Sequence, residues 1–289
     1  MSLLTPHDGL DHPMNGVAFG EPAAPLLARA DHDQPSVFRP ENLLREARRQ
    51  KGLGDGRVPR VCVLDPDGDI ADHVQSRHAA RRSAAWACYH TRLWEWDAAG
   101  ASYGIVGSAV GASFAVLVAE QLFASGCEVL ISIASAGQIT PVGQPPYHIL
   151  VDRALRDEGT SYHYLPPSNY ADADPALLAL ADEAFRDVGC RVHVGATWTT
   201  DAPFRETAEA IAARKAAGIL AVEMEAAALY AFAQARGVPV ICLAHVTNQL
   251  GCVEGDFEKG DANGACGSIE LVTAFASAWQ RAQARERSG

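Results

Sequence analysis

Residues 218–234 read GILAVEMEAAALYAFAQ, and this stretch decides how the chain folds around it. The apolar run before Glu223 predicts a buried strand, and the apolar run after Glu225 predicts a helix in the core. Glu223 and Glu225 therefore flank Met224 at a strand-to-helix junction. Acidic side chains are almost never fully buried without a partner, because an unpaired buried charge is costly. A sugar diol is a suitable partner, because a carboxylate accepts two hydrogen bonds at once.

Outward from this stretch, apolar runs of strand length alternate with segments of helical length. Continuous apolar strands that alternate with helices indicate a largely parallel sheet covered on both faces. Ligands of such sheets bind beyond the carboxyl ends of the strands. We predict strands at 60–64, 129–134, 147–151, 191–196, 219–222 and 238–246, a strand–turn–strand unit at 91–105, and helices at 70–86, 112–124, 175–187, 205–216, 224–235 and 268–285.

The first 57 residues differ in composition from the rest of the chain, being rich in Pro, His, Asp and Gly. One helix is predicted over residues 40–50, with Gly52 ending it. We interpret residues 1–57 as an N-terminal arm that packs on the main domain or on a neighbouring subunit. A partly disordered tail is the alternative interpretation. Residues 58–289 are predicted to form a single α/β domain.

Composition excludes several classes of function. The chain has 24 basic and 35 acidic residues, a net charge of -11, whereas a general nucleic-acid binder carries a basic surface. Its 7 cysteines have no paired spacing, which predicts reduced thiols and no metal site. The sequence shows neither an apolar run long enough to span a membrane nor a signal-peptide pattern. We therefore expect a cytoplasmic protein with a small-molecule ligand and no membrane contact.

Two glycine-containing segments directly follow predicted strands. Gly107 and Gly111 lie between a strand and a helix, where backbone N–H groups and the helix N-terminus favour an anion. Ser135 and Gly137 follow the strand at 129–134, and small hydroxyl residues beside glycine suit oxyanion or phosphate binding. For both segments the alternative is a turn that simply allows close packing.

Four further candidate residues come from other positions near predicted strands. Phe204 could stack on a flat base and Arg205 could donate a forked pair of hydrogen bonds to a carbonyl; a helix-capping turn is the alternative. Asn248 could both accept from and donate to a heterocycle, or instead form an Asx turn. His90 lies in an aromatic stretch with Tyr89, where a structural histidine is the alternative to a ligand-binding one.

These segments, in this order, resemble the nucleoside phosphorylase family, which includes uridine phosphorylase, hexameric purine nucleoside phosphorylase and the methylthioadenosine nucleosidases. The resemblance covers residues 58–289 and is most specific at Val222-Glu-Met-Glu-Ala226, followed by a helix, a strand and Thr247-Asn248. It implies an α/β three-layer sandwich with a mixed, largely parallel central sheet. It also implies an enzyme that needs no cofactor and assembles as a homo-oligomer, either a dimer or a trimer of dimers.

The resemblance assigns roles to individual residues. Met224 and Glu225 correspond to the residues that hold the ribose, with the carboxylate on the 2′ and 3′ hydroxyls. Ser135 corresponds to the Ser or Thr that contacts phosphate and ribose. Phe204 and Arg205 lie near the position of the base. Asn248 stands where purine enzymes carry an Asp and where uridine phosphorylase-like members have Asn, and Glu223, Gly107, Gly111, Gly137 and His90 complete the predicted substrate site.

The chain departs from the family at the phosphate-binding positions. The first loop of the family reads Pro-Gly-Asp-Pro-x-Arg, whereas here residues 64–69 read LDPDGD, without an Arg. A second phosphate-binding Arg of the family is replaced by Ser132. Acidic residues near a dianion repel it, and the nucleosidases of the superfamily also lack these arginines and use water. Phosphorolysis of a nucleoside is the first hypothesis, hydrolysis the second, and nucleoside binding without turnover the third.

Overall fold

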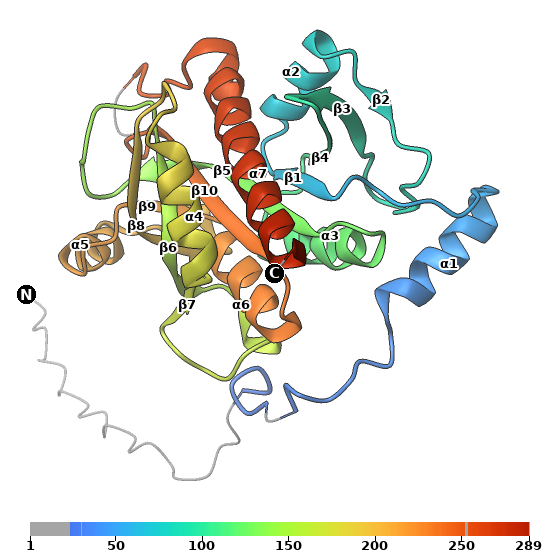
Figure 1. Ribbon diagram of the computed structural model, residues 1–289. Helices are drawn as coiled ribbons and strands as arrows, with labels where there is room; N and C mark the ends of the chain where they lie inside the picture. Colours follow the sequence, from blue (N-terminus) through green and yellow to red (C-terminus); the bar gives the residue numbers. More distant parts are fainter. Residues whose placement is uncertain (1–23, 30, 252–253, 289) are drawn as a thin grey trace, which may run out of the picture.

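A computed structural model describes residues 24–29, 31–251 and 254–288. Its core is a 10-stranded sheet with helices on both faces (Figure 1). The strands are β1 Val61–Asp65, β2 Arg81–Arg82, β3 Trp94–Ala98, β4 Ala101–Gly107, β5 Val129–Gln138, β6 Tyr147–Asp157, β7 Tyr170–Asp172, β8 Val192–Thr200, β9 Ala221–Glu223 and β10 Val240–Asn248. The helices are α1 Pro40–Lys51, α2 Asp69–Arg77, α3 Ala112–Ala124, α4 Pro175–Phe185, α5 Ala208–Ala216, α6 Ala226–Arg236 and α7 Ala265–Ser288, with 3-10 turns η1 Ser161–His163, η2 Pro203–Arg205 and η3 Asp261–Gly264.

The sheet is mixed, and five of its strands close on themselves. Strand order is β10-β6-β8-β9-β5-β1-β4-β3-β2, and β10 also pairs with β5, which completes a ring of β5, β9, β8, β6 and β10. Strands β4, β1, β5 and β10 run parallel to one another, so their carboxyl ends share one edge. The short β9 runs antiparallel to the end of β5, which brings the strand-to-helix junction of the Glu-Met-Glu segment back to that edge.

Two apolar cores lie on opposite faces of the sheet and make the molecule a three-layer sandwich. One core contains the buried faces of α3 and α6, which pack against each other. The other contains buried residues of α2, α4 and α7, and α4 and α7 run side by side (Figure 1). The buried residues in β1 alternate between the two cores, as the two-residue period of a strand requires. The predicted fold class is confirmed.

Most predicted elements are present, but the predicted helix over residues 70–86 is confirmed only up to Arg77 and is wrong beyond it. Helix α2 ends at Arg77, and Ala79 adopts the left-handed conformation (φ 48°) that an α-helix cannot contain. The chain then forms β2, which pairs with β3, and Arg81 forms an ion pair with Glu95 across that pairing. Tertiary pairing therefore overrides the local helical pattern in this segment.

Several strands continue further than predicted, and this relocates parts of the expected loops. Strand β5 extends to Gln138, so Ser135 and Gly137 lie in the strand and not in a loop after it. Likewise β10 includes Asn248, and β8 includes Thr197 to Thr200. The strands are longer because each extension has a hydrogen-bonding neighbour at the common edge, such as Gly137 with Val222 and Asn248.

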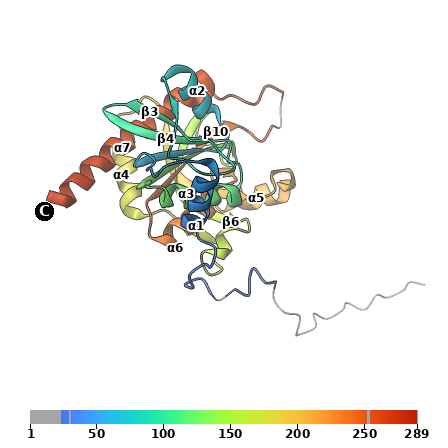
Figure 2. The ribbon, with the colours of Figure 1, turned by 90° about the vertical axis from the view of Figure 1, so that its right-hand side faces the viewer.

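The described part of the N-terminal arm packs on the same chain through α1. Figure 2 shows α1 beside α3. Leu44 and Ala47 are buried against Ala87, and the Lys51 ammonium donates hydrogen bonds to the carbonyl oxygens of Ala87 and Cys88. Gly52 adopts the left-handed conformation (φ 63°) and ends the helix, as predicted. No helix among the described residues is long and apolar enough to cross a membrane.

Candidate active site

The candidate site lies where β5, β9 and β10 meet at the shared edge of the sheet. Asn248 of β10 pairs with Gly137 of β5, and Gly137 pairs in turn with Val222 of β9. A Cβ atom on Gly137 would lie 2.5 Å from a methyl group of Leu250 and 3.3 Å from the side-chain oxygen of Asn248. A larger residue at this position would displace the side chain of Leu250, and the predicted residues from three strands come together around Gly137.

Glu223 is a buried carboxylate whose hydrogen-bonding capacity is used within the protein. Its Oε1 accepts hydrogen bonds from the hydroxyls of Thr197 (3.1 Å) and Thr199 (2.5 Å). Its Oε2 accepts the backbone N–H groups of Glu225 and Ala226, both at 2.7 Å, which are unpaired donors at the start of α6. Burial raises its pKa, and these hydrogen bonds oppose the rise. Glu223 thus acts as a cap for α6, with little capacity left for a ligand.

Glu225 has fewer partners inside the protein, although its side chain is equally buried. Its Oε1 accepts the backbone N–H of Gly111 at 2.6 Å, and its Oε2 accepts that of Met224 at 3.3 Å. Burial, followed by the charge of Glu223, raises the pKa of Glu225 to about 8. A carboxyl group with this pKa takes up or releases a proton near neutral pH, which is typical of functional sites.

The two glycines of the segment before α3 have different roles. A Cβ atom on Gly107 would lie 2.8 Å from the Cβ of Ala71, so Gly107 allows α2 to approach β4. Gly111 has open space around the equivalent position and donates its N–H to Glu225. Close packing, the alternative weighed for this segment, accounts for Gly107, whereas Gly111 contacts the candidate ribose-binding carboxylate.

The acidic segment after β1 reaches the predicted anion-binding residue. The Oδ2 atom of Asp67 accepts the backbone N–H of Ser135 at 2.7 Å. Asp65 is buried, accepts the N–H of Ala71 at 2.8 Å, and has its pKa raised to about 7, chiefly by burial. Asp69 forms an ion pair with Lys259. Sequence reasoning noticed this segment as a departure from the family but did not predict that Asp67 would bond to Ser135.

A second group missed by sequence reasoning is the histidine His245 on β10. Its ring stacks on that of His148 with centroids 4.6 Å apart, and burial lowers its pKa to about 4. A Cβ atom on Gly264 would lie 2.0 Å from the His245 ring, so this glycine lets the chain pass over it. The position of His245 within an otherwise apolar strand (VICLAHV, 240–246) is the signal that could have found it.

The amide of Asn248 forms a local structure. Its Oδ1 accepts the N–H of Leu250 at 2.8 Å, which is an Asx turn, and its Nδ2 donates to the hydroxyl of Thr247 at 3.1 Å. The turn holds the amide at the edge of the sheet next to Gly137. The Asx turn and a role of the amide in binding a base are thus compatible, since the turn fixes the position of the amide.

Three predicted residues are not brought to this edge by a contact in the described structure. Phe204 and Arg205 lie in η2, where Phe204 is 100% exposed and Arg205 is exposed. His90 is also exposed, and its ring forms a T-shaped contact with that of Phe114 at a centroid distance of 6.5 Å. Their contact with a substrate stays a prediction.

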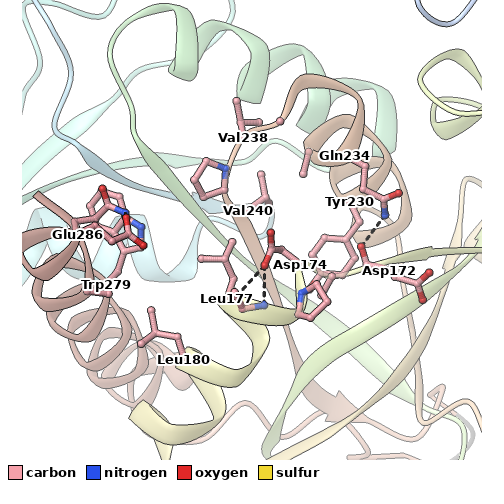
Figure 3. A pocket seen from close by; sticks show the side chains of 18 residues that line it. Asp172, Asp174, Leu177, Leu180, Tyr230, Gln234, Val238, Val240, Trp279 and Glu286 are labelled. Carbon is pink, nitrogen blue, oxygen red and sulfur yellow. Dashed lines mark hydrogen bonds between the residues drawn. The ribbon is translucent and has the colours of Figure 1, made fainter. Parts of the chain in front are cut away.

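A cavity that contains none of the predicted site residues lies at the opposite end of the strands. It has a volume of about 720 Å³, and its mainly apolar wall includes Val240, the first residue of β10 (Figure 3). Asn248 lies eight positions after Val240 in the same strand, roughly 26 Å away. The carboxylate of Asp174 in this cavity caps α4 by accepting the N–H groups of Ala176 and Leu177. The polar groups described above are at the other edge, so we assign the chemistry there.

Comparisons with known proteins agree with this architecture. The family described as "Phosphorylase superfamily" matches residues 60–282. A uridine phosphorylase from Thermococcus kodakarensis is 26% identical over 81% of this chain and 87% of that protein. A guanosine phosphorylase from Halorubrum lacusprofundi is 26% identical over 75% of this chain and 81% of that protein. The solved structure of uridine phosphorylase from Vibrio fischeri has the same fold, with a TM-score of 0.65 and 21% identity over 78% of this chain and 93% of that one.

The family match includes the elements that build the candidate site, from β1 through the Glu-Met-Glu junction to β10. It confirms the resemblance found in the sequence, and with it the prediction of a pentosyltransferase-type enzyme. The chain belongs to the phosphorylase superfamily.

Proposed function

We propose that the protein cleaves the N-ribosidic bond of a nucleoside. The observation that carries this proposal is the buried Glu225 carboxyl group, which lies beside Met224 at the edge of the sheet. Among the described residues it has only two hydrogen-bond partners, both of them backbone N–H groups. A carboxylate can accept further hydrogen bonds, so the 2′ and 3′ hydroxyls of a ribose can complete its coordination. The names of the relatives, which are phosphorylases of uridine and guanosine, support the same substrate class.

Glu225 would act mainly in the transition state. As the bond to the base breaks, the ribose gains positive charge, and a nearby carboxylate stabilises that charge more than it stabilises the neutral substrate. The pKa of about 8 set by the protein alone favours the protonated form at neutral pH. Donor hydroxyls and a developing positive charge both favour ionisation, so substrate binding lowers this pKa.

Asn248 and Arg205 are proposed to hydrogen-bond the departing base. An amide cannot act as a general acid, so a base that leaves as a stabilised anion is favoured over one that must first be protonated. This argument favours a pyrimidine nucleoside such as uridine over a purine nucleoside. Phe204 and His90 are proposed as further contacts of the substrate.

Two acceptors of the ribosyl group have support. Phosphate is supported by the relatives, whose names describe phosphorylases, and no cofactor is proposed in either case. Water is supported by the acidic segment, since Asp67 already bonds to Ser135, the residue expected to contact phosphate. We also propose that the protein is cytoplasmic and forms a homo-oligomer, a dimer or a trimer of dimers. Light scattering of the purified protein would measure the number of subunits.

The experiment is to incubate the purified protein with uridine, guanosine and related nucleosides, with and without phosphate, and to follow free base by chromatography. Base release under either condition supports nucleoside cleavage, and the sugar product identifies the acceptor. If no nucleoside releases its base under either condition while calorimetry detects binding, the protein is a nucleoside-binding protein and the proposed cleavage is wrong.

A further inference from the structure

We propose that Asp67 fills the anion site of this protein and that water, activated by Asp67, accepts the ribosyl group in place of phosphate. This inference rests on the nucleoside cleavage proposed above and identifies its second substrate.

The first argument is that the expected donor to phosphate already has a partner. The backbone N–H of Ser135 donates to Oδ2 of Asp67 at 2.7 Å, although the two residues are 68 positions apart in the chain. A hydrogen bond between an N–H and a carboxylate is short and strong. Phosphate could reach this N–H only by displacing the side chain of Asp67, which is itself anionic.

The second argument is the charge around Ser135. Asp65, Asp67 and Asp69 line a small cavity together with Ser135, and none of the described residues that line it is a lysine or an arginine. Lys259, which contacts the cluster, is paired with Asp69. Ser135 lies two residues before Gly137, the residue at which β5 pairs with both β9 and β10, so this cavity borders the candidate site. Such an arrangement repels a phosphate dianion but does not oppose a neutral water molecule.

The third argument is the size and lining of this cavity. Its volume is about 10 Å³, which is room for about one water molecule, whereas a tetrahedral phosphate is several times larger. His245 lines the same cavity and is only 6% exposed, and neither of its ring nitrogens has a hydrogen-bond partner among the described residues. Because burial lowers the pKa of His245 to about 4, its ring is neutral and has one acceptor nitrogen for a water hydrogen.

The reaction that follows is a hydrolysis. The water oxygen forms a bond to C1′ of the ribose while the bond from C1′ to the base nitrogen breaks, and its electron pair leaves with the base. The carboxylate of Asp67 takes one proton from the attacking water. That proton passes through solvent to the base, so the products are free ribose and the neutral base, and Asp67 is regenerated.

The deciding experiment compares the sugar product formed with and without inorganic phosphate. We expect base release at the same rate in both conditions, with free ribose as the product. Base release that requires phosphate, with ribose 1-phosphate as the product, would overturn this inference and leave nucleoside cleavage standing. An absence of base release in both conditions would overturn both proposals.

A variant tests the role of Asp67 directly. Asp67→Ala is expected to lower the rate constant of base release about a hundredfold or more, because it removes a general base. The matched control is Asp72→Ala, since Asp72 is an exposed acidic residue in α2 with no role in the site. A rate in Asp67→Ala equal to that of the control would show that Asp67 is not the base.

Phosphate binding provides a measurement that is independent of turnover. In the wild-type protein and in Asp72→Ala, millimolar phosphate should shift the unfolding temperature no more than chloride of equal ionic strength does. In Asp67→Ala the freed N–H of Ser135 should allow phosphate to raise the unfolding temperature beyond the chloride value. A phosphate-specific rise in the wild-type protein would contradict the proposal.

Discussion

At the scale of single residues, the two glutamates of the Glu-Met-Glu segment have separate tasks. Both side chains are buried, yet from the described residues Glu223 receives four hydrogen bonds and Glu225 receives two, one of them long. The residue with unused acceptor capacity is the one available to a substrate. The sequence places the two carboxylates symmetrically around Met224, so only their partners distinguish them.

Glu225→Gln is predicted to lower nucleoside cleavage by about a hundredfold to a thousandfold, because it removes the charge that stabilises the developing positive charge on the ribose. The shape of the side chain is kept, so the fold should remain intact. Initial rates of base release would measure the loss, with circular dichroism confirming the fold. Wild-type turnover in this variant would exclude Glu225 from the reaction.

The buried titratable residues also predict how stability depends on pH. The pKa values of Asp65 and Glu225 are raised to about 7 and about 8, so their contribution is complete at low pH and is lost as pH rises through these values. Those of His148 and His245 are lowered to about 3 and about 4, so their contribution is lost as pH falls below the ordinary histidine value of 6.5. The carboxyl contribution begins to decline above the ordinary carboxyl values of 3.8 and 4.5, so between these values and 6.5 the two effects oppose each other. Stability should therefore be greatest within that range and should fall above pH 6.5.

Thermal unfolding between pH 4 and pH 9 would test this expectation. The midpoint should fall on both sides of the maximum, and Glu225→Gln should flatten the alkaline side because its amide does not ionise. An alkaline side as steep in the variant as in the wild-type protein would show that another group causes it.

At the scale of elements, the end of β8 and the start of α6 are held together by one hydroxyl. Thr199 donates to Glu223 at 2.5 Å and accepts the backbone N–H of Ala227 at 2.9 Å, with all three groups buried. The pairing of Thr199 with Glu223 in the sheet sets this geometry. Glu225 directly precedes α6, so its position depends on Thr199, a residue in β8.

Thr199→Val is predicted to cost about 1–3 kcal/mol of unfolding free energy, while keeping the shape of the side chain. It leaves the buried N–H of Ala227 without this acceptor and removes one of the two hydroxyl donors to Oε1 of Glu223. Urea denaturation would measure the cost. The exposed Thr207 offers a comparison, because its hydroxyl only caps α5 through the N–H of Ala210. Thr207→Val should cost less, about 1 kcal/mol, and an equal cost for both variants would contradict the role given to Thr199.

At the scale of the whole molecule, α1 ties the N-terminal arm to the α/β core. The side chain of Leu44 is 1% exposed, whereas that of Leu27, earlier in the arm, is 53% exposed. Among the described residues of the arm, α1 thus supplies the buried apolar side chains Leu44 and Ala47, while Arg29 and His32 add polar contacts with His163 and Tyr162. The division of the chain at residue 57 stays a prediction, because α1 packs as part of the core and yet precedes the matched family region.

Leu44→Ala is predicted to destabilise the protein by about 2–4 kcal/mol through the lost burial and the cavity left behind. For a chain of this size, that corresponds to a fall in the unfolding temperature of several degrees. Leu27→Ala should change it little, because its side chain is already exposed to solvent. Differential scanning calorimetry would compare the two, and similar values would show that α1 unfolds independently of the core.

The sequence by itself determined the α/β class, most strands and helices, and the Glu-Met-Glu junction. Hydrophobic periodicity and capping glycines act over a few residues, so patterns such as α1 ending at Gly52 are visible locally. The helix predicted over residues 70–86 failed in its second half, because the strand pairing of Arg81 and Arg82 with β3 lies outside that local pattern.

Only the tertiary structure decided which residues share the site. The contacts of Asp67 with Ser135 and of Gly111 with Glu225 join residues 68 and 114 positions apart. Such contacts depend on the order and register of the strands, which no local pattern encodes. The sequence showed that the arginines were missing, and the fold showed that an aspartate bonds to the N–H expected to bind phosphate.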